Sequence, residues 1–135
     1  MSAPTELSIG QKLPVLEIPI TARLIVSCAL ASQDFEDVHH DKAAAQAAGT
    51  PDIFMNILST NGLVGRYLTD WAGPSARIQR IQLKLGAPNF PGDTMTMSAS
   101  IVAINDELIE VEFKGKNGLG NHVSGTATLS MGESA

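Results

Sequence analysis

Residues 53–71 read IFMNILSTNGLVGRYLTDW, and their apolar side chains recur at the i, i+3 and i+4 spacing of a helix. This pattern predicts one buried helix over residues 53–70. Gly62 and Gly65 are unusual inside it, because each lowers helix stability by about 1 kcal/mol relative to alanine. We expect strands to pass close over the helix at these two glycines, where a side chain would obstruct them. The segment therefore predicts a helix wrapped by a sheet.

The sequence that follows the Gly73-Pro74 break has the alternation typical of β-strands. Ile81, Leu83 and Leu85 alternate with polar residues, and three further segments are separated by turn residues: 94–104, 108–113 and a last strand that reaches Leu129. Together they predict an antiparallel meander of about four strands. A helix and a sheet that each have one apolar face can cover one another, so we expect an α+β fold.

Two shorter helices are predicted ahead of the main one. The first covers residues 22–30 with Thr21 as its N-cap, and the second is an alanine-rich segment that Asp41 caps and Gly49 ends. Residues 1–19 are expected to be irregular. We predict a single domain over residues 1–135, with its core in about 20–131.

Composition excludes several classes of function. A formal charge of −5 without a Lys/Arg cluster argues against binding to nucleic acid or an anionic membrane, so the partner is expected to be a small molecule or another protein. No apolar run approaches the roughly 20 residues that span a bilayer. The single cysteine, Cys28, is expected to lie in the core, and the first residues lack the pattern of a signal peptide. These features predict a cytoplasmic protein.

Residues 34–41 read DFEDVHHD and combine four carboxylates with two imidazoles. Such a cluster can transfer protons, hold a metal ion, or form a solvated helix cap. A metal site around His39 and His40 is disfavoured, because adjacent histidines in an extended loop point apart and no further His/Cys pair completes a shell. His122 stands alone in a predicted strand, where a surface or hydrogen-bonded structural role is expected.

The order of these motifs resembles a known family. An Asp-x-x-x-x-His loop at 34–39, an alanine-rich helix ending at Gly49, a long helix and the turn at 90–94 are similar to the MaoC-like, R-specific enoyl-CoA hydratases of the hot-dog fold. The resemblance spans residues 20–131. Within the family, the chain is most similar to the small subunit of the heteromeric enoyl-CoA hydratase of actinobacterial steroid side-chain degradation, through segments 34–41, 52–58 and 69–75.

The resemblance implies roles for three residues. Asp34 and His39 match the catalytic pair that holds a water for syn addition to a 2-enoyl-CoA thioester. Asn56 stands where the family usually has glycine, and its backbone N–H is expected to stabilise the thioester oxygen at the amino end of the long helix. No cofactor and no metal is implied, since CoA is part of the substrate.

The chain departs from the family pattern around these residues. Gln33 precedes Asp34, and Glu36-Asp37 replaces the usual Asn-Pro. The two extra acids either disfavour an ionised Asp34 by repulsion or are solvated. The Asn56 side chain narrows the pocket, supplies an amide donor, or is simply tolerated.

The resemblance also implies an oligomer in which two hot-dog units lie side by side and form the active site between them. The partner is either a second copy or a different MaoC-like chain that provides the groove for the acyl group. Two alternatives to a catalytic hydratase remain: a non-catalytic partner of another hydratase, and a hot-dog acyl-CoA thioesterase. The sequence leaves the acyl group and the product stereochemistry open.

Overall fold

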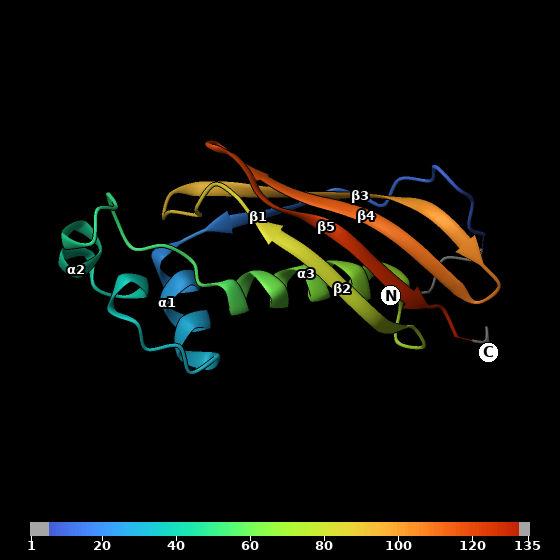
Figure 1. The fold of residues 1–135 in the computed structure, drawn as a ribbon, viewed down its shortest axis with the longest axis horizontal. Helices are drawn as coiled ribbons and strands as arrows, with labels where there is room; N and C mark the ends of the chain where they lie inside the picture. Colours follow the sequence, from blue (N-terminus) through green and yellow to red (C-terminus); the bar gives the residue numbers. More distant parts are fainter. Residues whose placement is uncertain (1–5, 133–135) are drawn as a thin grey trace.

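The long helix α3 (Ile57–Ala72) lies along one face of a five-stranded antiparallel sheet. The structure is a computed structural model that describes residues 6–132. Figure 1 shows α3 extended along the sheet, with the short helices α1 (Ala22–Ala31) and α2 (Lys42–Ala47) at one end of the molecule. The predicted α+β architecture is confirmed, and so are the N-caps of both short helices, Thr21 and Asp41.

The core forms between α3 and the sheet face that it covers. Along β4 (Leu108–Asn117), Ile109, Val111 and Phe113 are buried while the residues between them are exposed, as expected for a strand with one face on a core. Val64 and Leu68 of α3 are fully buried in the same cluster. Apolar burial of this kind, at about 25 cal/mol per Å², is the main term that holds the helix to the sheet.

The strand order differs from the predicted meander. The strands β2 (Arg77–Leu85), β3 (Asp93–Asn105), β4 and β5 (Gly120–Ser130) were all expected. However, the order is β1-β3-β4-β5-β2, so β2 pairs with β5 and not with β3, which follows it in the chain. The simple four-strand meander is therefore wrong. Alternation reveals which face of a strand is buried, but it does not identify the neighbouring strand.

The fifth strand, β1 (Leu16–Ile20), lies in a segment that we expected to be irregular. It pairs with β3 at one edge of the sheet and buries Ile18 and Ile20. Alternation of Leu16, Ile18 and Ile20 was visible in the sequence, but Pro19 between them argues against a strand. An edge strand tolerates proline, because one side of its backbone needs no ladder hydrogen bonds. Residues 1–5 of the same expected segment lie outside the described residues.

Helix α3 begins at Ile57, four residues later than predicted, and it ends at Ala72. Asn56 is its N-cap, with an extended backbone and a side chain that accepts a hydrogen bond from the backbone N–H of Ser59. Ile53 and Met55 are nevertheless buried, because the loop before the helix enters the core. Their apolar character therefore extended the helical pattern beyond the helix itself.

The expected reason for Gly62 and Gly65 is wrong. A Cβ at either position would meet nothing within 4 Å, so no strand among the described residues passes close over them. The close approach lies in the sheet instead: a Cβ at Gly125 of β5 would overlap the carbonyl oxygen of Gln82 on β2. Nothing in the described part of the chain explains the two helical glycines.

Candidate active site

The loop that follows α1 brings Asp34 and His39 together. Ser32 is the C-cap of α1, Gln33 has a left-handed backbone with φ of 58°, and the backbone N–H of Asp34 donates to the carbonyl of Ala29. A 3₁₀ turn, Asp37–His39, then returns the chain toward Asp34. The Nε2 atom of His39 lies 3.4 Å from Oδ2 of Asp34. The predicted pair is therefore assembled within one loop.

The His39 imidazole is held from two sides. Its Nδ1 lies 2.7 Å from the carbonyl oxygen of Phe54, and its ring contacts the Phe54 ring edge-on, with centroids 5.1 Å apart. A carbonyl can only accept a hydrogen bond, so Nδ1 is the donor. In the neutral ring, Nε2 then carries no proton and presents its lone pair toward Asp34. The side chain is buried, with 8% of the residue exposed.

The Asp34 carboxylate receives two hydrogen bonds from N–H groups. The side-chain amide of Asn56 donates to Oδ2 at 3.0 Å, and the backbone N–H of Glu36 donates to Oδ1 at 3.3 Å. The Asn56 bond is the main cause that lowers the pKa of Asp34, and desolvation opposes it. The Glu36 N–H and, when the His39 ring is protonated, its positive charge lower this pKa by smaller amounts. The pKa is thus lowered, and repulsion from Glu36 and Asp37 does not dominate.

Of the three alternatives for the Asn56 side chain, the structure shows the amide donor. The side chain supplies this donor to Asp34 and also contacts Ser32 and Ser59. Neither serine was predicted from the sequence to belong to the site. Asparagine is a preferred N-cap residue, so Asn56 could have been predicted as the N-cap of α3. The same rule would have predicted that the backbone N–H of Ser59, three residues later, donates to the Asn56 side chain. The role of the Asn56 backbone N–H remains a prediction.

The remaining members of the 34–41 cluster point elsewhere. The His40 ring is exposed and contacts the carbonyl of Phe35 at 3.3 Å and the Asp37 carboxylate at 3.8 Å. Asp41 caps α2 by accepting from the N–H of Ala44. Across residues 6–132, no three His, Cys, Asp or Glu side chains are grouped so that they could hold a metal ion. The two histidines therefore belong to separate hydrogen-bond networks.

His122 is a buried structural residue, as one of the two expectations had it. A bulge between β4 and β5 leaves it without a register partner on β4, and its ring reaches Thr60 of α3. Its Nδ1 donates to the carbonyl of Ala87 at 2.8 Å, and its Nε2 accepts from the hydroxyl of Thr60 at 2.8 Å. Burial lowers the pKa of His122, and this effect outweighs the Ala87 bond, which acts in the opposite direction. The neutral ring joins the sheet to the first turn of α3.

We expect His122 to make folding stability depend on pH. Its folded pKa lies below the value of about 6.5 for an unfolded histidine, so the unfolded chain binds a proton that the folded chain resists. The stability that the neutral His122 contributes to the folded state is fully present above about pH 6.5 and is lost as the pH falls toward the folded pKa of His122. Urea unfolding between pH 5 and 8 should show the decline, and His122→Asn should reduce its slope even if that variant is less stable overall. An equal slope in both proteins would contradict the assignment.

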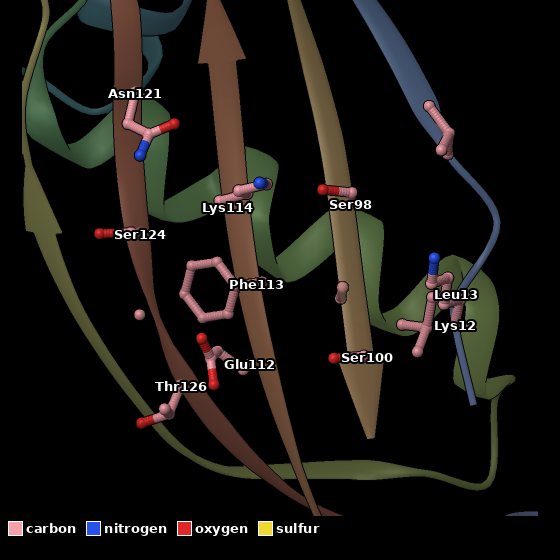
Figure 2. Close-up of a pocket in the computed structure, with 13 residues that line it drawn as sticks. Lys12, Leu13, Ser98, Ser100, Glu112, Phe113, Lys114, Asn121, Ser124 and Thr126 are labelled. Carbon is pink, nitrogen blue, oxygen red and sulfur yellow. The ribbon is translucent and has the colours of Figure 1, made fainter. Parts of the chain in front are cut away.

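Two hollows differ in their relation to the Asp34–His39 pair. A trough of about 720 Å³ lies over β3, β4 and β5, with α3 behind the sheet (Figure 2). Its lining combines serine and threonine residues and the charged side chains of Lys12 and Lys114 with apolar residues such as Leu13 and Phe113. Neither Asp34 nor His39 lines it. The hollow beside Asp34 is smaller and more open, at about 400 Å³, and it is lined by residues 33–37. Asp34 therefore borders an open surface of the chain, whereas His39 is buried beside it.

Comparisons with known proteins agree on one family. Residues 5–128 match the family described as MaoC like domain. The chain is 52% identical over 126 residues to the 3-oxo-4,17-pregnadiene-20-carboxyl-CoA hydratase beta subunit of Mycobacterium tuberculosis. The aligned region covers 93% of this chain and 98% of that protein. No helix within residues 6–132 is long and apolar enough to cross a membrane.

Solved structures show the same fold. A chain in the ChsH1–ChsH2 complex from Mycobacterium tuberculosis superposes with a TM-score of 0.90 and 52% identity, over 92% of this chain and 98% of that one. The (R)-hydratase from A. caviae, involved in PHA biosynthesis, superposes with a TM-score of 0.85 over 94% and 98% of the two chains. Because its identity to this chain is 21%, the (R)-hydratase shows a similarity of fold alone.

Proposed function

Because the chain belongs to the MaoC-like domain family, we propose that it is an enoyl-CoA hydratase, or the catalytic small subunit of one, with Asp34 and His39 as its catalytic residues. The observation that carries the proposal is the 3.4 Å approach of His39 Nε2 to Asp34 Oδ2. A carboxylate and an imidazole at this distance can hold one water molecule and exchange protons with it.

The proposed reaction adds the elements of water to one face of the double bond of a 2-enoyl-CoA. The water oxygen bonds to Cβ, its proton passes to the Asp34–His39 pair, and a proton from the pair is delivered to Cα. Negative charge develops on the thioester oxygen meanwhile, and the backbone N–H of Asn56 at the amino end of α3 is the proposed donor to it. The reaction requires no redox or group-transfer cofactor, since CoA enters with the substrate.

For the acyl group, we propose a steroid side chain. The support is the 52% identity to the M. tuberculosis subunit named for a pregnadiene carboxyl-CoA, which extends over nearly the whole of both proteins. The hollow beside Asp34 has few apolar walls, because Phe35 is the only large apolar residue that lines it. A bulky apolar acyl group therefore needs a second surface, consistent with a partner chain that completes the groove.

We propose that a second MaoC-like chain, identical or different, pairs along the free edge of β2. The sheet ends in β1 and β2. β1 has five residues and contains Pro19, which lacks a backbone N–H, whereas β2 has nine residues without proline. Leu85 at the end of β2 is 42% exposed. A long unprotected edge next to an exposed leucine is suited to strand pairing with a partner.

Leu85→Asp is therefore expected to weaken assembly by placing a charge at this edge. Val102→Asp is the matched control, because Val102 is an apolar strand residue of similar exposure, 40%, on β3. Sedimentation velocity over a range of concentrations, with and without the partner chain, should show a larger dissociation constant for Leu85→Asp alone. Equal weakening in both variants would argue against β2 as the pairing edge.

The proposed activity is tested with the chain purified together with its natural partner. Straight-chain and steroid 2-enoyl-CoA substrates should be converted to 3-hydroxyacyl-CoA, identified by mass spectrometry. Release of free CoA thiol would instead indicate a thioesterase. Hydration that survives loss of both Asp34 and His39, but not loss of the partner's own acid and base, would assign this chain a non-catalytic role.

A further inference from the structure

The Asn56 side chain is buried, with 2% of the residue exposed, and its orientation follows from its neighbours. Its Oδ1 accepts from the backbone N–H of Ser59 at 3.3 Å and from the Ser59 hydroxyl. A backbone N–H can only donate, so the amide oxygen must face Ser59. The NH₂ group of Asn56 then faces the opposite way, toward Asp34.

Both hydrogens of this NH₂ group have acceptors. One is Oδ2 of Asp34 and the other is Oγ of Ser32, each at 3.0 Å. Ser32 is the C-cap of α1, and its hydroxyl lies 2.8 Å from the carbonyl of Cys28, to which it donates. Its oxygen lone pairs are therefore available to Asn56. The amide thus joins the end of α1 to the start of α3, with the Asp34 carboxylate attached to it.

The geometry has a direct consequence for the proton that Asp34 could carry. The Oδ2 atom that accepts from Asn56 is also the atom that faces Nε2 of His39. A permanent N–H donor at this oxygen stabilises the carboxylate and opposes its protonation. The Asn56 donor at Oδ2 and the Glu36 N–H, which donates a hydrogen bond to Oδ1, together limit rotation of the carboxylate.

We propose that Asn56 is a positioning residue of the hydratase site, whose amide keeps Asp34 ionised and directed at His39. The inference rests on the proposed function for its catalytic meaning. It goes beyond the backbone role expected for Asn56, because it assigns a separate task to the side chain. Asn56 performs this task while capping α3, so the first turn of the helix and the carboxylate are held by one amide.

Asn56→Ser separates the two tasks. Serine is a good N-cap, so α3 should form, but its hydroxyl is too short to reach Asp34. Asn56→Asp also retains the cap and places a second carboxylate beside Asp34. Asn61→Ser is the matched control, because Asn61 lies on the same helix and its amide only returns to the carbonyl of Ile57 at 3.1 Å.

The first measurement needs no substrate. In the assembled protein, with ¹³C-labelled aspartate in this chain, the carboxyl resonance of Asp34 is titrated with pH. Its pKa should move up in Asn56→Ser and further up in Asn56→Asp, and it should be unchanged in Asn61→Ser. An unchanged titration in both Asn56 variants would overturn the inference.

The second measurement is the pH dependence of kcat/KM. In Asn56→Ser, the acidic limb should move to higher pH together with the Asp34 titration, and kcat/KM at neutral pH should fall roughly tenfold or more. A loss of rate without movement of the limb would also overturn the inference, because a merely structural role predicts that result. If the titration moves as expected but wild-type protein hydrates no enoyl-CoA, the proposed function fails while the electrostatic role of Asn56 stands.

Discussion

Replacing His39 by alanine is expected to lower kcat/KM for enoyl-CoA hydration by roughly 10²–10⁴-fold, the usual contribution of a positioned acid–base group. The imidazole is oriented by the carbonyl of Phe54 and faces Asp34, so its removal leaves the carboxylate without its acid–base partner. His40→Ala is the control. His40 is the next residue and has the same chemistry, yet its ring contacts the Phe35 carbonyl and is directed away from the pair.

Asp34→Asn should have an effect of similar size with little change in packing, because the amide has nearly the shape of the carboxylate. The double variant Asp34→Asn/His39→Ala should be hardly worse than either single variant, since residues that act as a unit are strongly non-additive. Initial rates with the partner present, together with circular dichroism to verify folding, measure these effects. Near-wild-type rates in both single variants would contradict the assignment.

Leu68→Ala is expected to reduce the free energy of unfolding by about 2–5 kcal/mol, the largest stability effect that we predict. Leu68 has no exposed surface and lies on the side of α3 that packs against the sheet. Truncation removes apolar contacts and leaves a cavity that the surrounding strands cannot fill without breaking their pairing. The change tests whether α3 is the centre of the core.

Leu58→Ala is the matched control, because Leu58 is the same residue type on the same helix but is 50% exposed. Its effect should stay under about 1 kcal/mol. Guanidinium unfolding should be recorded at one fixed protein concentration, since assembly with a partner adds to the apparent stability. Equal destabilisation by the two substitutions would mean that the buried face of α3 is wrongly assigned.

Much of the fold followed from local patterns. Thr21 and Asp41 marked the starts of α1 and α2, because capping uses side chains three residues from the groups that they bond. The alternation in β4 identified its buried face. The start of α3 was misplaced, since the buried loop residues Ile53 and Met55 mimic a helical face. Pairing of β2 with β5 was missed, because it joins segments far apart in the chain.

The candidate site was likewise predicted only in part. Asp34 and His39 were identified from their spacing and the family resemblance, and one loop of the structure brings them together. The carbonyl of Phe54 that orients His39, and the Ser32–Asn56 bond, join residues 15 and 24 positions apart. Spacing within a motif does not encode such contacts, because they depend on how α1 and α3 meet.

The sequence by itself determined the α+β class and the helix caps, since these depend on periodicity and on residues a few positions apart, while the family resemblance singled out Asp34 and His39 as the candidate pair. Only the tertiary structure decided that α3 begins at Ile57, that β2 forms a free edge beside β5, and that the Asn56 amide bonds Asp34. These features arise where segments distant in the chain are packed together, and burial and hydrogen-bond satisfaction then select one arrangement among those that the local pattern allows.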